Sequence, residues 1–185
     1  MRFRLLKYFV GVIIYSLRFG HLTFLSMFTI FGGALFMIAI GCDHAAVALK
    51  KAIVDHLQKN GFEVKDFGCY GTDSVDYPDY ALKVSEAVAG GECEKGILIC
   101  GTGIGMCIAA NKVKGIRCAH CSDTFSAKAT RMHNDANVLA MGERVIGVGL
   151  ALDIVDCFVN TPFSADARHV RRIDKINQIE NKYFK

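Results

Sequence analysis

The chain has 185 residues, with 22 Lys and Arg against 18 Asp and Glu, 52% hydrophobic residues and only 2 Pro. This composition excludes a mostly disordered chain, and the length suits one domain of ordinary size. The formal charge of +4 comes entirely from residues 1–36, which contain no acid, so 18 basic and 18 acidic residues remain from position 37 onward. Because nucleic acid is bound through a basic face, this neutral body argues against nucleic acid as a partner.

Residues 1–36 differ from the rest of the chain. They carry Arg2, Arg4, Lys7 and Arg18, and then an uncharged apolar run over residues 22–36. One interpretation is a signal or signal-anchor segment, which would tether the protein to a membrane. The other is an upstream translation without function, with Met37 as the true start. We favour the second, because a folded domain begins at Met37, and we expect one domain over residues 37–185 that excludes the extension.

The cysteines do not have the pattern of a small secreted disulfide scaffold, so we expect reduced thiols in a cytoplasmic protein. The eight are Cys42, Cys69, Cys93, Cys100, Cys107, Cys118, Cys121 and Cys157. Cys118 and Cys121 form a CxxC pair, but they lie in an expected strand and would point to opposite faces of it. A zinc site is therefore disfavoured there.

From Met37 onward, short apolar runs alternate with helical patterns. Strands are expected at residues 37–41, 62–67, 96–100, 116–120 and 137–142. Helices are expected from residue 46 to Gly61, from Pro78 through residue 88, and from the glycine turn after residue 100 through residues 109–110. Three more are expected over residues 124–133, 147–159 and 164–183. This order predicts an α/β fold with a five-stranded parallel doubly wound sheet, Rossmann- or flavodoxin-like, and an extra C-terminal helix. The expected strand order is 2-1-3-4-5.

In that order the first and third strands are neighbours at the point where ligands bind such sheets. The residues that follow them are Cys42, Asp43 and His44 on one side, and Cys100, Gly101, Thr102, Gly103, Ile104 and Gly105 on the other. Free backbone N–H groups at a glycine turn before a helix attract anions and favour a thiolate at Cys100. Asp43 and His44 could supply acid–base chemistry. On spacing alone, a merely buried Cys100 is an equally good interpretation.

Two further features allow other interpretations. The glycines at 101, 103 and 105 suggest dinucleotide binding, with Asp123 about 20 residues later as the ribose acid, although the GxGxxG pattern is incomplete. His133 and Asn134 end a helix that runs antiparallel to the strands, so they lie at the opposite edge from Cys100. His133 could therefore serve the site of a second subunit, or the pair could be a helix C-cap with Asn134 in the left-handed position.

Basic residues cluster near the start of the last helix. Arginine forks suit phosphate, but a solvated charged face is also a common meaning of such a run. The cluster comprises Arg168, His169, Arg171 and Arg172. The remaining histidines, His21, His56 and His120, have no polar constellation around them and are interpreted as structural.

Taken together, these residues resemble the ribose/galactose isomerase family, in particular its type B ribose-5-phosphate isomerases. The matching segments cover nearly all of residues 37–185, and residues 1–36 have no counterpart. They are GCDHAA (41–46), DYPDYA (76–81), GILICGTGIGMCIAANK (96–112), GIRCAH (115–120), HNDANVLAMGERVIG (133–147) and RHVRRI (168–173).

The resemblance implies interconversion of D-ribose 5-phosphate and D-ribulose 5-phosphate through a cis-enediolate, without a metal or an organic cofactor. Cys100 matches the catalytic base, and the loop with Gly101, Gly103, Ile104 and Gly105 matches the anion hole. His133 matches the residue that opens the furanose ring, with Thr102 and Asp43 as its partners. The resemblance assigns phosphate and substrate contacts to His44, Asn134, Arg168 and Arg172. It also implies a homodimer with shared active sites, with higher oligomers open.

Other functions stay open at this point. Galactose 6-phosphate and allose 6-phosphate isomerases are close alternatives, because sugar length is not readable from the matched residues. A non-catalytic nucleotide-binding module of the same fold is an alternative of a different class.

Overall fold

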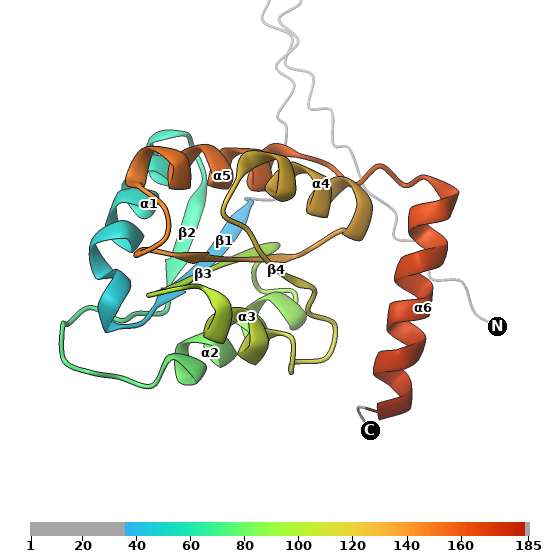
Figure 1. Cartoon of the computed structure of the whole chain (residues 1–185), viewed down its shortest axis with the longest axis horizontal. Coiled ribbons are helices and arrows are strands. Elements are labelled where there is room, and N and C mark those ends of the chain that lie inside the picture. The colour runs from blue at the N-terminus through green and yellow to red at the C-terminus, as the bar shows by residue number, and fades with distance from the viewer. Residues whose placement is uncertain (1–35, 184–185) are drawn as a thin grey trace, which may run out of the picture. The chain divides into compact units, whose positions relative to one another are not determined.

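Residues 36–183 are described by the computed structural model, which places a five-stranded parallel sheet between two layers of helices (Figure 1). The strands are β1 (Met37–Cys42), β2 (Glu63–Asp66), β3 (Lys95–Cys100), β4 (Cys118–His120) and β5 (Val138–Gly142). Every neighbouring pair is parallel, and the order across the sheet is β2-β1-β3-β5-β4. Strands β1, β3 and β5 are almost wholly buried, because helices cover both of their faces.

The helices divide between the two faces of the sheet. Helices α1 (Val47–Lys59), α4 (Thr124–Asn134) and α5 (Val148–Asn160) cover one face, and α2 (Tyr77–Ala89) and α3 (Ile104–Ala110) cover the other (Figure 1). A short 3-10 turn, η1 (His44–Ala46), leads from β1 towards α1. Successive residues of β3 pack on opposite sides, with Ile97 and Ile99 in one apolar cluster and Leu98 in the other.

The last helix, α6 (Ala167–Tyr183), lies outside these layers and packs against the body through α4 (Figure 1). His169 is its only buried residue. The helix begins at Ala167 rather than near residue 164 as expected, because Ala165 has a φ of +55° that an α-helix does not accommodate.

The expected fold class, a parallel doubly wound sheet with an extra C-terminal helix, is confirmed, but the expected order of the last two strands is wrong. β5 pairs with β3, and β4 lies at the edge of the sheet. The physical reason is burial: all five residues of β5 are buried, whereas β4 has three residues and ends in the exposed His120. The central position therefore goes to the wholly apolar strand.

The expected extension, apart from Phe36, lies outside the described residues, so its interpretation stays a prediction. Phe36 itself packs edge-on against Phe62, with ring centroids 5.8 Å apart, and is partly buried against the core. Within residues 36–183, no helix is long and apolar enough to cross a membrane.

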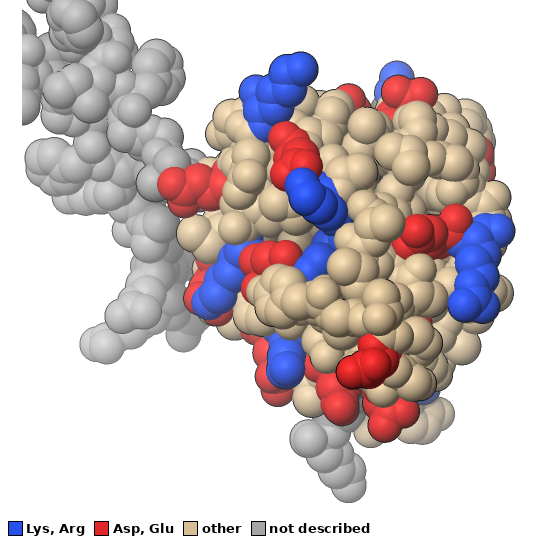
Figure 2. Space-filling view, turned by 90° about the vertical axis from the view of Figure 1, so that its left-hand side faces the viewer, with Lys and Arg blue, Asp and Glu red and all other residues tan. Residues whose placement is uncertain are grey.

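Charged side chains are mixed on the face shown in Figure 2, where basic and acidic groups are interspersed. Oppositely charged side chains also pair directly among the described residues, for example Lys50 with Asp66 at 2.7 Å and Lys51 with Asp55 at 2.7 Å. This face therefore has no continuous basic surface of the kind that binds a phosphate backbone.

Candidate active site

Asp43 and Cys100 lie side by side where the carboxyl ends of β1 and β3 meet. The two strands pair with Cys42 opposite Ile99, which brings the next residue of each strand to adjacent positions. The Asp43 N–H donates to the Ile99 carbonyl at 3.1 Å, so the pairing continues to this point. The Asp43 carboxylate accepts a hydrogen bond from the Ala45 N–H at 3.0 Å, which fixes its direction. Both residues are buried, with 8% of Asp43 and 5% of Cys100 exposed.

The loop after β3 turns its backbone towards the Cys100 sulfur. The Gly103 N–H donates to Sγ at 3.0 Å, and such a bond stabilises negative charge on sulfur. Gly103 has a φ of +79°, and a Cβ there would lie 2.8 Å from the His120 ring. At Gly142, a Cβ would lie 2.6 Å from the Thr102 carbonyl. The loop therefore needs glycine at both positions to reach the sulfur.

Amide donors of this loop, rather than a helix dipole, make the edge attractive to an anion. Helix α3 has only seven residues, so its macrodipole is small. Ile104 and Thr102, at the tip of the loop, are exposed, and the Thr102 hydroxyl accepts from the Ile104 N–H at 3.4 Å. The Thr102 hydroxyl is therefore available at the surface of the site.

His120 supports the same loop, a role that its sequence context did not suggest. Its Nε2 lies 2.8 Å from the Thr102 carbonyl oxygen, and because a carbonyl only accepts, Nε2 carries the proton in this contact. His56 also has a polar partner, since its Nε2 lies 2.7 Å from a carboxylate oxygen of Asp156 and links α1 to α5. The expectation that no polar group surrounds these two histidines is wrong.

Glu143 and Arg144 also belong to this edge, because they follow β5 next to the end of β3. The Glu143 N–H donates to the Cys100 carbonyl at 3.0 Å, and the Arg144 side chain lies 3.6 Å from where a Cβ on Gly101 would be. One carboxylate oxygen of Glu143 is buried without a partner among the described residues. Burial, and to a smaller extent the charge of Asp43, raises the pKa of the Glu143 carboxyl.

Glu143 and Arg144 are not predicted from the sequence, because the expected strand order places residues 137–142 one strand too far from β3. The available signal was composition. Residues 138–142 are entirely apolar or glycine, as a central strand requires, whereas the 116–120 segment contains Arg117 and His120.

His44 and Cys42 also lie at this edge, and each makes a hydrogen bond to the backbone. The His44 Nδ1 accepts from the Val75 N–H at 3.2 Å, which leaves Nε2 as the free nitrogen. Cys42 directs its thiol to the Cys69 carbonyl at 3.6 Å, and burial raises its pKa to about 12. Cys42 is therefore a neutral thiol, and all eight cysteines are free. We call Asp43, His44, Cys100 and the loop residues 101–105 the carboxyl-edge group.

A second set of candidates gathers where α4 ends and α6 begins. His133 and Asn134 are exposed at the end of α4, and the His133 ring lies on the His169 ring with centroids 4.4 Å apart. The His169 Nδ1 is 2.9 Å from the Ser164 hydroxyl, and burial lowers the pKa of His169. The left-handed cap of α4 is Asp135, with a φ of +46°, and not Asn134 as expected.

Arg168 and Arg172 flank His169 at the start of α6, and both are exposed. Arg168 has only a long contact to Asp166, 3.8 Å between Nη2 and Oδ2. Their guanidinium groups are therefore largely available to a ligand. We call His133, Asn134, Arg168 and Arg172 the amino-edge group.

One chain does not bring the two groups together. Val138 pairs with Gly96 at the start of β3, whereas Cys100 pairs with Gly142 at its end, a separation of about 13 Å along the strand at 3.3 Å per residue. The amino-edge group belongs to the Val138 side of this interval, because α4 leads into the start of β5. Neither Thr102 nor Asp43 therefore meets His133 of the same chain.

The residues on which two alternative interpretations depend, dinucleotide binding and a zinc site at the CxxC pair, have other contacts in the structure. The Asp123 carboxylate accepts from the Ser126 N–H at 2.7 Å and from its hydroxyl at 2.8 Å, so it caps α4 instead of facing a nucleotide. Cys118 and Cys121 pack in the apolar clusters on opposite sides of the sheet, as the strand pattern predicts. In the part of the chain that the structure describes, no three His, Cys, Asp or Glu side chains are placed to hold a metal ion.

Comparison with known proteins decides the family. Residues 38–176 match the model of the family described as Ribose/Galactose Isomerase. The chain belongs to the ribose/galactose isomerase family. Ribose-5-phosphate isomerase B of Escherichia coli is 50% identical over 145 residues, which is 78% of this chain and 97% of that protein. D-erythrulose-4-phosphate isomerase of Pectobacterium atrosepticum is 44% identical over 146 residues, 78% of this chain and 95% of that protein.

The fold of this family member is also that of solved isomerase structures. Ribose-5-phosphate isomerase B of Clostridium thermocellum superposes with a TM-score of 0.78 at 56% identity, covering 80% of this chain and 99% of that one. The resemblance stated from the sequence motifs is therefore confirmed at the level of family and fold.

Proposed function

We propose that this protein interconverts D-ribose 5-phosphate and D-ribulose 5-phosphate through a cis-enediolate. One observation carries the proposal: the Cys100 sulfur, held by the Gly103 N–H at 3.0 Å, lies beside the buried Asp43 at the ligand-binding edge of an isomerase-family sheet. The relatives named ribose-5-phosphate isomerase B support this substrate.

The chemistry requires one base that serves two adjacent carbons. The Cys100 thiolate removes the proton from C2 of the open aldose, the C2–H electron pair forms the C1–C2 double bond, and the carbonyl oxygen becomes an enediolate oxygen. Returning the proton to C1, while the O2 proton passes to O1 and the C2–O2 bond becomes the carbonyl, gives the ketose. Those N–H groups of loop residues 101–105 that do not donate to the Cys100 sulfur or the Thr102 hydroxyl stabilise the oxyanion, an effect typically worth about 10²–10³ in rate for each donor. No step needs a metal or an organic cofactor.

The amino-edge group completes the site in our proposal. His133 opens the furanose ring, with Thr102 and Asp43 as partners, and Asn134 contacts the sugar. His44, Arg168 and Arg172 hold the phosphate, for which guanidinium forks are well suited. Arg144, beside Gly101, adds a cation at the same edge.

Because the two groups lie at opposite edges of one chain, we propose a homodimer with two shared active sites. The exposed apolar side chains of α6 support a partner surface there, since Val170, Ile176 and Ile179 are 40%, 45% and 61% exposed. A two-fold axis would give each site one group from each subunit.

Six-carbon sugar phosphates remain the second candidate substrates. In our proposal the residues of both groups contact functional groups that pentose and hexose phosphates share. A nucleotide-binding module is less well supported, since Asp123 is occupied as a helix cap.

An isomerase assay of the full chain tests the proposal, with Cys100→Ala alongside and with ribose 5-phosphate, galactose 6-phosphate and allose 6-phosphate as substrates. We expect ribose 5-phosphate to give the highest kcat/KM and the variant to lose turnover while staying folded. Inactivity of the folded chain on all three sugars would overturn the function, and activity of Cys100→Ala would overturn the base.

A further inference from the structure

The residue that follows the His133–Asn134 pair adopts an unusual backbone conformation. Asp135 has φ +46° and ψ +45°, the left-handed region, at the C-cap of α4. Glycine adopts this conformation without steric cost and is the usual residue at such a cap. An aspartate at this position therefore points to a use for its carboxylate beyond ending the helix.

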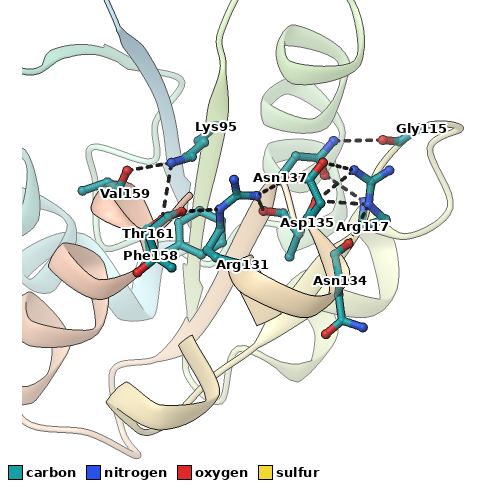
Figure 3. Close-up of polar contacts among 11 residues, drawn as sticks. Lys95, Gly115, Arg117, Arg131, Asn134, Asp135, Asn137, Phe158, Val159 and Thr161 are labelled. Carbon is teal, nitrogen blue, oxygen red and sulfur yellow. Dashed lines mark hydrogen bonds and ion pairs between the residues drawn. The ribbon is translucent and has the colours of Figure 1, made fainter. Parts of the chain in front are cut away.

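The Asp135 carboxylate joins two arginines from different elements (Figure 3). Its Oδ1 accepts from Nη1 of Arg131 on α4 at 2.8 Å, and its Oδ2 accepts from Nη2 of Arg117, before β4, at 3.0 Å. Arg131 is only 7% exposed, so its pairing takes place where charge is weakly screened. We call Asp135, Arg117 and Arg131 the anchor.

The anchor also holds the backbone on both sides of Asp135. Nε of Arg117 donates to the carbonyls of Asn134 at 3.0 Å and of Asp135 at 3.1 Å, and Nη1 of Arg131 donates to the carbonyl of Ala136 at 2.5 Å. Three consecutive carbonyls directly after His133 are thus fixed by two planar guanidinium groups (Figure 3). A cap that only ended the helix would not need this set.

The other side of His133 is held by a different contact. Its ring lies on His169 of α6, which in turn meets Ser164. The exposed His133 ring therefore lies between a backbone held by guanidinium groups and the ring of His169, which is tilted 48° to it. Loosening the backbone would let the ring move relative to the site to which it contributes.

We propose that Asp135, through Arg117 and Arg131, is a positioning residue that fixes His133 for ring opening. This inference rests on the proposed function. In that step His133 accepts the proton of the C1 hydroxyl, the C1–O4 bond breaks as the aldehyde forms, and the ring oxygen takes up a proton. The step is sensitive to distance, because a misplacement of about 1 Å can cost about a hundredfold in rate.

A substrate that never forms a ring separates this role from general damage. Erythrose 4-phosphate cannot close a furanose, because its C4 oxygen carries the phosphate, so its isomerisation needs Cys100 but no ring opening. The test compares kcat on ribose 5-phosphate and on erythrose 4-phosphate for the wild type and for Asp135→Gly. Glycine adopts the left-handed backbone without steric cost, and the change removes the Asp135 side chain with its carboxylate. Asp135→Asn, which keeps one acceptor oxygen, is the milder second variant.

We expect Asp135→Gly to lower kcat on ribose 5-phosphate by about tenfold to a hundredfold, with a smaller loss for Asp135→Asn. The kcat on erythrose 4-phosphate should stay within about threefold of the wild type, as for His133→Ala. Asp156→Gly removes a comparable partly buried contact, to His56, away from both groups, and should leave both activities unchanged. Equal losses on both substrates, or no loss on either, would overturn the proposal.

Side-chain NMR of His133 gives a readout that does not depend on turnover. The His133 ring signal should shift or broaden in Asp135→Gly while the Cys100 region keeps its wild-type signals. An unchanged His133 signal would refute the anchor even in an inactive chain. A wild type without activity on ribose 5-phosphate would instead refute the proposed function, so the two failures are distinguishable.

Discussion

At the scale of single residues, Cys100 differs from the other thiols of this edge in what its sulfur contacts. The Cys100 sulfur accepts an N–H from Gly103 at 3.0 Å, whereas the Cys42 thiol donates to a carbonyl and has a pKa raised to about 12 by burial. One sulfur is thus a hydrogen-bond acceptor and the other thiol a donor. Two cysteines on adjacent strands thus have different chemistry because their hydrogen bonds run in opposite directions.

Replacing Cys100 by Ser tests this difference directly. A hydroxyl fits the same space but is a far weaker proton acceptor at neutral pH, so kcat should fall by about 10²–10⁴-fold. Steady-state kinetics on ribose 5-phosphate measures the loss, and Cys157→Ser, on α5, is the matched control that should retain activity. Comparable rates for the two variants would remove Cys100 from the mechanism.

Lys95 provides a prediction on pH and stability. Its buried amine donates to the Val159 carbonyl at 2.6 Å, and burial, with a contribution from Arg131, lowers its pKa to about 8. The unfolded chain holds this proton up to a pKa of about 10.4, so the wild type gains stability as pH rises from about 8 to 10. Lys95→Met lacks this gain. Urea unfolding at pH 7 and at pH 10 gives the free energy of unfolding of the wild type and of Lys95→Met. The difference between the two proteins should change by on the order of 3 kcal/mol from pH 7 to pH 10. A difference independent of pH would contradict the shifted pKa.

At the scale of elements, the loop of residues 101–105 depends on close backbone approach as well as on φ. Gly103 and Gly61 have similar φ values, +79° and +83°, but a Cβ on Gly103 would strike the His120 ring, whereas at Gly61 nothing lies within 4 Å. Gly61→Ala should therefore cost only the left-handed penalty, about 1–2 kcal/mol. Gly103→Ala should cost more and also lower kcat. Denaturant unfolding and the isomerase assay measure both, and equal stability costs with unchanged kcat would show that the loop tolerates displacement.

Helix α6 presents its arginines on different sides. Arg168 and Arg172 are four residues apart and share a face that borders the buried His169, whereas Arg171 lies about 160° around the helix from His169. If the shared face binds phosphate, Arg168→Ala or Arg172→Ala should raise KM by about ten- to a hundredfold, as expected for a charge-assisted hydrogen bond. Arg171→Ala should leave KM unchanged. Equal KM values for all three variants would show that these arginines form a solvated charged face and do not bind the phosphate.

The elements also show how far the sequence leads. Short apolar runs predict the buried strands β1, β3 and β5, because burial on both faces demands such runs, and the alternating pattern of residues 62–67 predicts β2. The exchange of β4 and β5 was not predicted, since the usual strand order was assumed and the polarity of Arg117 and His120 was not used to place that strand at the edge. This one error concealed Glu143 and Arg144, whose proximity to Cys100 is a tertiary contact with no local pattern.

At the scale of the whole molecule, the two groups of candidate site residues lie at two edges of the sheet about 13 Å apart. The helix direction made this division predictable from the sequence, because a helix between parallel strands returns its C-terminus to the edge where the next strand begins. Two contacts were not predictable from the sequence: the tilted contact between the His133 and His169 rings, and the anchor at Asp135. Both join residues that local periodicity does not connect. The division itself leads to the central claim, that each active site takes one group from each of two subunits.

A heterodimer of two inactive variants tests this claim most directly. Cys100→Ala and His133→Ala subunits, co-expressed with different tags and purified as the mixed dimer, would form one intact site and one doubly defective site. We expect each mixed dimer to have about half of the wild-type turnover, because one of its two sites is intact. The matched control combines Cys100→Ala with Asp43→Ala, which belong to the same group, and should remain inactive. A Cys100→Ala and His133→Ala dimer as inactive as its parents would contradict the shared site.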